Sequence, residues 1–214
     1  MDENKNRSRR AAVLWSAAGI LLCLGICGSA WLRGAFLPKW VRWEERTETI
    51  RIPEDHELFL PEGAPAPAVI GEAELQLSGK RVGIRETAGD RVPEGGSVKT
   101  YRSPVSWLVQ DALVCDLNGD GADEVILLVW KRGSFGGARP FWVTRDEIGF
   151  SEHIFIFKYM NGTLRPLWMS SKMGIPVQSV TYGEDGKLHL SAPDGTETVW
   201  EWNRWGLTLA ETGV

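Results

Sequence analysis

One segment determines the architecture of this chain: Asp116-Leu117-Asn118-Gly119-Asp120-Gly121-Ala122-Asp123-Glu124, followed at once by Val125-Ile126-Leu127-Leu128-Val129-Trp130. Oxygen-bearing side chains stand at positions one, three, five and nine of the segment, and a glycine stands at position six. Hard cations such as calcium take about six to eight oxygen ligands, which a tight loop with this spacing can supply. The segment predicts a calcium loop whose ligands are Asp116, Asn118, Asp120, the backbone carbonyl of Ala122, and Glu124.

The residues around this loop predict strands. An EF-hand needs a glutamate at position twelve and a helix on each side, whereas position twelve here is Leu127 inside an aliphatic run. Val125–Trp130 is apolar on both alternating faces, which favours a strand buried on both sides. A plain hairpin is the alternative, because Asn118-Gly119 and Asp120-Gly121 are strong turn dipeptides. A bare turn, however, would leave three carboxylates repelling one another.

The loop resembles the calcium loop of FG-GAP repeats, also called VCBS repeats, which form the blades of integrin-α-like β-propellers. The resemblance is carried by Asp-x-Asn-x-Asp-Gly, an acidic residue at position nine and the aliphatic strand that follows. The chain departs from the family at Glu124, where aspartate is usual, and at residues 129–133, where the family commonly has Gly-Ala-Pro. The resemblance implies a propeller-like fold and a structural calcium ion.

Regularly spaced turns predict an all-β fold. Two groups of four strands are expected: Leu108–Cys115, Val125–Trp130, Ile154–Met160 and Thr163–Met169, then Gln178–Tyr182, Leu188–Ala192, Thr198–Asn203 and Leu207–Glu211. Asn161-Gly162 marks a two-residue hairpin in the first group. Residues 48–105 would form a less regular third unit. Because closed propellers have about four to eight blades, we expect a partial or small propeller-like array of three or four antiparallel sheets.

The N-terminal part predicts a membrane anchor. Residues 11–32 form a 22-residue stretch without a charged side chain, long enough to span a bilayer. Basic residues in the first ten positions favour a cytoplasmic N-terminus. A cleaved signal peptide with a site at Gly28-Ser29-Ala30 is the alternative. The expected regions are a cytoplasmic tail (1–10), a transmembrane anchor (11–32), a juxtamembrane and Pro-rich linker (33–68) and a β-propeller-like domain (69–214).

Charge and cysteine content exclude several classes of protein. The formal net charge is −4, and because the first ten residues contribute +2, the remainder carries −6. An acidic body argues against nucleic-acid binding, which requires a basic surface. Cys115 is the only cysteine after residue 32, so a disulfide framework is not expected. The three histidines are scattered, which argues against a zinc site.

The glycine-rich segment 132–142 is the candidate second site. We expect it to be a long connection whose aromatic side chains cover a sheet. The alternative is a binding site, in which Arg132 and Arg139 could hold an anion while Phe141 or Trp142 stacks on a ligand ring. The chain also has eleven tryptophans. We expect those of the last strand group (Trp200, Trp202 and Trp205) to fill the space between sheets.

No catalytic residues are predicted, because the common hydrolase, metalloprotease and dinucleotide motifs are missing from the sequence. The neighbouring acids Asp123 and Glu124 should point to opposite sides of a strand. We therefore expect a single-pass protein of the cell membrane, with its C-terminal domain outside, acting as a non-enzymatic module stabilised by one calcium ion. The expected partner is a protein or a cell-surface polymer, and self-association could complete a ring. The alternatives are a carbohydrate-binding module that uses segment 132–142 and, third, a hydrolase.

Overall fold

The computed structural model describes residues 37–53, 69–87, 99–135 and 140–213, together with the isolated positions Cys23 and Gly25. The chain divides into two compact units, Met1–Pro38 and Lys39–Val214, and the twelve described strands all lie in the second. Within the described residues, no helix is both long and apolar enough to cross a bilayer. The predicted anchor lies outside the described residues apart from Cys23 and Gly25.

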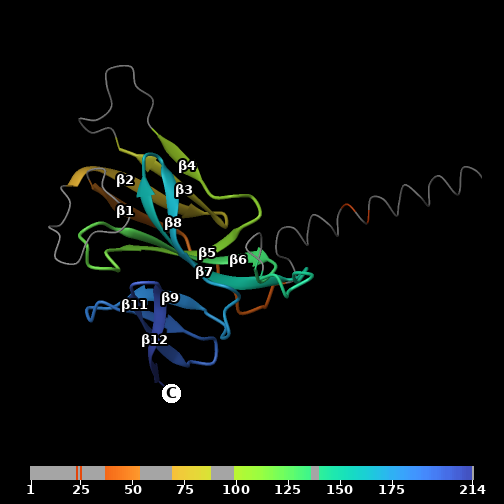
Figure 1. The fold of residues 1–214 in the computed structure, drawn as a ribbon. Helices are drawn as coiled ribbons and strands as arrows, with labels where there is room; N and C mark the ends of the chain where they lie inside the picture. The colour runs from red at the N-terminus through yellow and green to blue at the C-terminus, as the bar shows by residue number, and fades with distance from the viewer. Residues whose placement is uncertain are drawn as a thin grey trace, which may run out of the picture. The chain divides into compact units, whose positions relative to one another are not determined.

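The second unit contains three antiparallel sheets, each made of four strands that follow one another in sequence (Figure 1). Sheet A comprises β1 (Arg46–Pro53), β2 (Val69–Ser78), β3 (Arg81–Glu86) and β4 (Thr100–Arg102). Sheet B comprises β5 (Leu108–Cys115), β6 (Glu124–Arg132), β7 (Phe150–Met160) and β8 (Thr163–Met169). Sheet C comprises β9 (Ser179–Tyr182), β10 (Leu188–Ser191), β11 (Glu197–Asn203) and β12 (Gly206–Gly213). The predicted all-β fold, with its four-strand groups, is confirmed.

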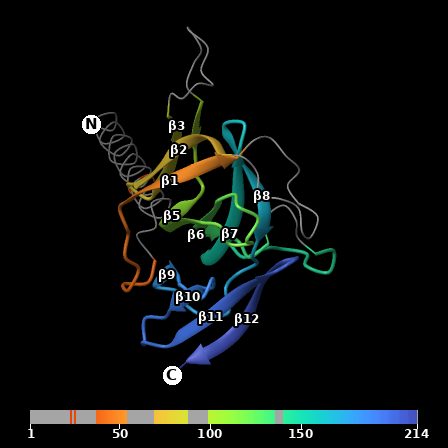
Figure 2. The ribbon, with the colours of Figure 1, turned by 90° about the vertical axis from the view of Figure 1, so that its left-hand side faces the viewer.

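Sheet B packs between the other two sheets (Figures 1 and 2). Successive side chains of a strand point to opposite faces, and β6 shows both faces buried. Val125, Leu127 and Val129 belong to a hydrophobic cluster shared with sheet A. Ile126 and Leu128 belong to a second cluster shared with sheet C. The sheet order therefore explains why this segment is apolar at every position, and two-sided burial is confirmed.

The hairpin between β7 and β8 has the predicted turn. Asn161 and Gly162 both have positive φ, 53° and 79°, as a type I′ turn requires. The turn brings Met160 opposite Thr163 in the antiparallel register.

The compact unit begins earlier than the predicted domain boundary. β1 lies in the region assigned to the linker, yet it pairs with β2 along its whole length, from Arg46 opposite Leu77 to Pro53 opposite Val69. Ile50 and Ile52 of β1 are buried in the cluster between sheets A and B. The unit thus starts at Lys39 and includes residues that precede the Pro-rich segment.

The middle position of sheet B predicts that both faces of β6 contribute comparably to stability. Ile126→Ala and Leu127→Ala each remove a fully buried side chain, one from each cluster. We expect each substitution to lower the free energy of unfolding by about 2–5 kcal/mol, measured by urea denaturation. Leu209→Ala, at a position that is 48% exposed, serves as the control. An Ile126→Ala variant as stable as this control would contradict the three-layer packing.

Candidate functional site

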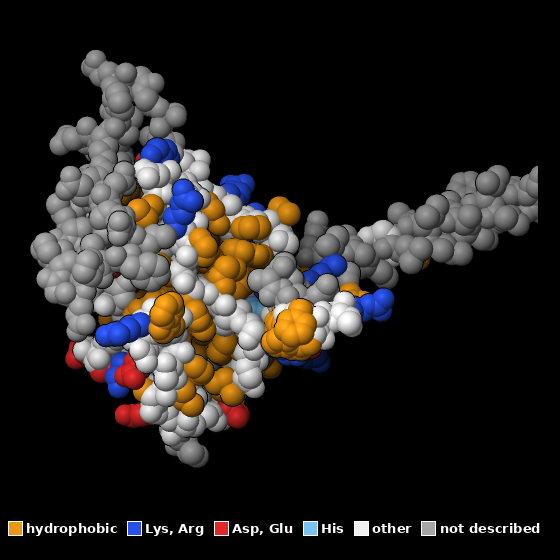
Figure 3. Space-filling view, viewed as in Figure 1, with side chains coloured by type: hydrophobic (Ala, Val, Ile, Leu, Met, Phe, Trp, Pro, Cys, Tyr) orange, Lys and Arg blue, Asp and Glu red, His pale blue; other side chains and the backbone are white. Residues whose placement is uncertain are grey.

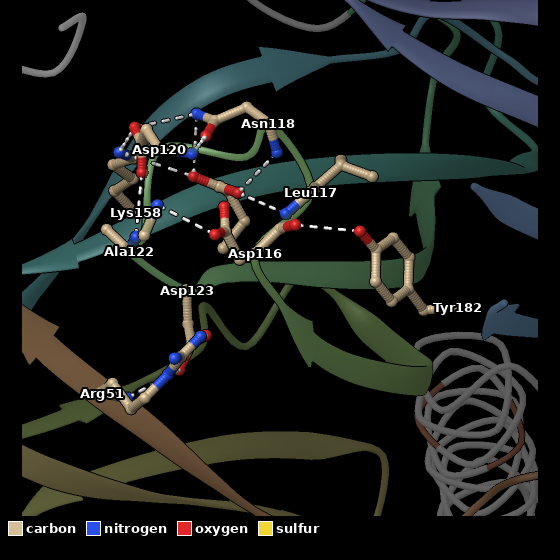
Figure 4. A network of polar contacts seen from close by, with 11 residues as sticks. Arg51, Asp116, Leu117, Asn118, Asp120, Ala122, Asp123, Lys158 and Tyr182 are labelled. Atoms are coloured by element: carbon tan, nitrogen blue, oxygen red, sulfur yellow. Dashed lines mark hydrogen bonds and ion pairs between the residues drawn. The ribbon is translucent and has the colours of Figure 1, made fainter. Parts of the chain in front are cut away.

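The predicted cation loop connects β5 to β6. Asp116 follows the last residue of β5, and Glu124 is the first residue of β6. Gly119 and Gly121 have φ values of 74° and 83°, which glycine adopts without steric cost. The resulting turns direct the oxygen-bearing side chains of the loop toward one another (Figure 4).

Backbone N–H groups of the loop donate hydrogen bonds to these side-chain oxygens. Four bonds have lengths of 2.8–2.9 Å: Leu117 N to Glu124 Oε2, Asp120 N to Asn118 Oδ1, Gly121 N to Asp116 Oδ2, and Ala122 N to Asp120 Oδ1. The predicted side-chain ligands are thus brought together, and they organise the loop through hydrogen bonds.

The ammonium group of Lys158 supplies the positive charge next to the carboxylates of the loop. This residue lies in β7 directly opposite Glu124, and its side chain is only 2% exposed. Its Nζ forms an ion pair with Asp120 and lies 3.6 Å from Glu124 Oε1. Asn118 Nδ2 donates to the same two carboxylates at 3.1 Å. A buried ammonium requires such partners, because its desolvation is otherwise uncompensated.

This arrangement fits an ammonium ion better than a calcium ion. The oxygens of Asp120 and Glu124 that calcium would need are in contact with Lys158. One feature favours an additional cation: Asp116 Oδ1 is buried and has no hydrogen-bond partner among the described residues. Within the same part of the chain, no group of three or more His, Cys, Asp or Glu side chains is placed to hold a metal. Calcium binding therefore remains a prediction, with Lys158 as its competitor.

Burial controls the protonation of this loop. The pKa of Glu124 is raised to about 8, chiefly by burial; the ammonium of Lys158 opposes the shift, and the nearby carboxylates of Asp120 and Asp116 add to it. Burial also raises the pKa of the neighbouring Cys115 thiol to about 12. Cys115 is therefore a buried, unreactive strand residue, as its sequence position suggested.

The loop also contacts the two outer sheets (Figure 4). Asp123 accepts hydrogen bonds from the backbone N–H of Arg51 in β1, at 2.8 Å, and from its guanidinium. On the other side, the hydroxyl of Tyr182 in β9 donates to the carbonyl of Asp116 at 3.0 Å. Asp123 and Glu124 thus have different partners, which confirms that they diverge. One loop contacts sheets A, B and C.

The second predicted site lies at the other end of β6. The β6–β7 loop (residues 133–149) begins directly after Arg132, the last residue of β6. The strand has nine residues, so about 25–30 Å separates the two loops. The two candidate sites are therefore not brought together.

A fixed base supports the β6–β7 loop. Asp146 accepts hydrogen bonds from the backbone N–H groups of Ser134 at 2.8 Å and Phe135 at 3.2 Å. Gly133 N donates to Gly149 O at 3.1 Å. A Cβ at Gly133 would lie 2.3 Å from Asp146 Oδ2, and its φ is 78°, so this position requires glycine.

The aromatic residues of the loop do not cover a sheet. Phe141 is 93% exposed and Trp142 is 70% exposed, with their rings edge to face at 4.8 Å. Arg132 is instead half-buried, with its guanidinium 5.4 Å from the ring of Phe150. Arg139 lies outside the described residues. The structure thus supports exposed aromatic residues at this site and places Arg132 at its base.

The tryptophans of sheet C divide into two groups. Trp200 and Trp202 are half-buried against the cluster between sheets B and C, as expected. Trp205 is 90% exposed, so the expectation of burial is wrong for this residue. It lies in the tight turn between β11 and β12, where its side chain has no sheet to cover it.

The sequence did not predict a group of buried polar residues on β7. Ser151 Oγ lies 2.9 Å from His153 Nε2, and His153 Nδ1 lies 3.1 Å from Ser170 O. This pair superficially resembles a nucleophile and its base. Ser151 is 2% exposed and His153 is fully buried, so a substrate cannot reach either side chain in this arrangement. Three consecutive polar residues, 151–153, in an otherwise largely apolar strand were the available signal.

Comparison with protein-family models gives no match for this chain, and comparison with curated proteins gives none either.

Removing the ammonium should destabilise the fold strongly. Lys158→Met keeps an unbranched side chain but leaves Asp120 and Glu124 without their cation. We expect the free energy of unfolding to fall by about 3–5 kcal/mol in chemical denaturation. Lys172→Met is the control, because Lys172 is 52% exposed and pairs with an equally exposed Glu147. Equal stability of the two variants would contradict the role assigned to Lys158.

The same variants separate lysine from calcium as the cation of the loop. A ligand that binds only the folded state raises the melting temperature. We expect no difference between calcium and chelator for the wild-type protein, and a calcium-dependent rise for Lys158→Met. A calcium-dependent rise in the wild-type protein would instead support the calcium prediction.

Glu152 should make stability depend on pH. It is 5% exposed, one carboxylate oxygen accepts from Val177 N at 2.9 Å, and burial raises its pKa to about 8 from an ordinary 4.5. Between these pH values the unfolded chain loses the proton while the folded protein keeps it, so stability falls as pH rises. The loss is at most about 5 kcal/mol.

Glu152→Gln should reduce this fall, measured by urea denaturation at about pH 5 and about pH 8. Glu124 titrates in the same direction and is present in both proteins, so the difference between them reports Glu152 alone. Parallel pH profiles for the two proteins would refute the assignment.

Proposed function

We propose that this protein is a membrane-anchored, non-enzymatic β module that binds a protein or an acidic polymer outside the cytoplasm. The uncharged stretch at residues 11–32 supports the anchor, and the basic residues before it support a cytoplasmic N-terminus. The N-terminal segment would hold Lys39–Val214 at the outer surface of the membrane.

We further propose that this unit is a small propeller-like array related to FG-GAP repeats. Propellers repeat four-stranded antiparallel sheets around a centre. Here each sheet consists of four consecutive strands, and β5, the first strand of sheet B, contacts both β1 and β9, the first strands of sheets A and C. The loop sequence at residues 116–124 supports the same relationship.

The observation that carries the binding proposal is an arginine-lined groove on the outer face of sheet A. Gly83 lies between Arg81 and Arg85 along β3 and directly opposite Arg102 of β4. A Cβ at Gly83 would have no neighbour closer than 4.0 Å, so the centre of the groove is open. The groove is lined by Glu74, Gln76, Ser78, Arg81, Gly83, Ile84, Arg85, Thr100, Tyr101, Arg102 and Val105.

The arginines of the groove suit an acidic partner. Arg81 is held by hydrogen bonds from its guanidinium to Ser103. Arg85 and Arg102 are exposed and form no ion pair with another described residue. The planar guanidinium binds carboxylate and phosphate groups in a bidentate manner. A cluster of three arginines is distinctive on a body that carries a net negative charge.

The test is retention of the full chain, in detergent, on polyglutamate and dextran sulfate columns. Arg85→Ala/Arg102→Ala should elute at clearly lower salt than the wild-type protein, because two exposed cations of the groove are lost. Lys172→Ala/Lys187→Ala removes the same charge elsewhere and should elute like the wild-type protein. Identical elution of both double variants would reject the groove as the binding site.

A carbohydrate-binding module is the second candidate. It is favoured by the exposed Phe141–Trp142 pair, since aromatic rings can stack on sugar rings. Under this alternative, glycan binding would depend on Trp142 and not on Arg85 or Arg102.

A further inference from the structure

The β6–β7 loop exposes an unusual amount of apolar surface. Four of its large side chains are exposed: Phe135 (38%), Phe141 (93%), Trp142 (70%) and Ile148 (68%). The hydrogen bonds of Asp146 fix the base of the loop, so the exposure belongs to an organised structure. Clustered apolar side chains on a surface mark contacts with proteins or with membranes. Figure 3 shows hydrophobic side chains projecting from this part of the unit, near Lys and Arg side chains.

The chain enters the β unit at the same end. Trp40, the second residue of the unit, packs against Trp130 with ring centroids 5.8 Å apart, and Trp130 lies two positions before the end of β6. From there, β1 runs away from the β6–β7 loop toward the cation loop, where Arg51 meets Asp123. In Figure 1, residues 39–45 and the β6–β7 loop both lie toward the right-hand end of the unit.

The charges at this end suit a lipid surface. Lys39 and Arg42 are exposed beside the chain entry, where they outnumber the exposed Glu45, and Arg145 is exposed in the loop. Trp43 lies under the ammonium of Lys80, 4.2 Å from its ring centroid. Of the acidic residues in the loop, Asp146 is turned inward to backbone N–H groups, and Glu147 pairs with Lys172 at 3.2 Å. Tryptophan together with lysine and arginine is typical of the membrane–water interface.

We propose that the tip of the β6–β7 loop inserts Phe141 and Trp142 into the interface of the membrane that anchors the protein. This inference rests on the proposed anchor and adds a second membrane contact to it. Because the anchor keeps the loop close to the bilayer, even weak partitioning of two aromatic side chains is sufficient. The two contacts fix the orientation of the unit and direct the cation-loop end away from the membrane.

The test uses the full chain reconstituted into vesicles with and without brominated lipid acyl chains, which quench tryptophan fluorescence. Trp142→Phe should lose part of the quenchable emission, because one membrane-inserted indole is removed. Trp205→Phe removes an even more exposed indole (90%) from sheet C and should lose none of it. A Phe141→Ser/Trp142→Ser variant with an unchanged melting temperature should show less quenching than the wild-type protein.

The outcomes separate this inference from the proposed function. Failure of the full chain to sediment with vesicles would overturn the anchor, and the inference with it. Sedimentation with equal quenching in the wild-type protein and Trp142→Phe would overturn the loop contact alone. Glycan binding that is lost in Trp142→Phe, with no change in quenching, would assign the loop to carbohydrate.

Discussion

The ammonium of Lys158, held between Asp120 and Glu124, is the interaction on which the arrangement of the three sheets depends. An unpaired buried charge costs several kcal/mol, so the lysine and the two carboxylates must be buried together or not at all. Lys158 stands opposite Glu124, and this pairing therefore favours one register of β7 against β6. The loop that carries the carboxylates also contacts β1 through Asp123 and β9 through Asp116. The loop that forms ion pairs with Lys158 in sheet B therefore also forms hydrogen bonds with sheets A and C.

The two ends of β6 lead into loops with different properties. Its first residue, Glu124, belongs to a loop whose side chains form hydrogen bonds and ion pairs with other residues of the protein. Its last residues lead into a loop whose aromatic side chains are exposed. Between them, the strand is buried on both faces and cannot contact a partner. Among the described residues, the candidate interaction surfaces are the β6–β7 loop and the arginine groove on the outer face of sheet A.

Local sequence signals predicted the elements and failed where long-range register was needed. Alternation, turn dipeptides and the two-sided apolar run located the strands of sheets B and C within a few residues. The loop composition also predicted that the side chains of Asp116, Asn118, Asp120 and Glu124 lie in one loop cluster, while the carbonyl of Ala122 stays a predicted ligand. Lys158 was not predicted, because its partnership with Glu124 depends on a register set across a long loop. Likewise, residues 48–105 were expected to form a third unit, yet the expected domain boundary at residue 69 placed β1 in the linker, because its pairing with β2 spans the segment 54–68.

One departure of this loop from the calcium loops it resembles, at Glu124, has an explanation in the geometry. The ninth position carries glutamate where aspartate is usual. The longer side chain lets the two oxygens of one carboxylate contact different partners. Glu124 Oε2 accepts the N–H of Leu117, while Oε1 faces Asn118 and Lys158. A free calcium ion would be lost when the ion is scarce, whereas a lysine on the adjacent strand is always present at the loop. The raised pKa of Glu124 also makes the stability of the loop depend on the protonation of this buried carboxylate, whether or not a metal binds.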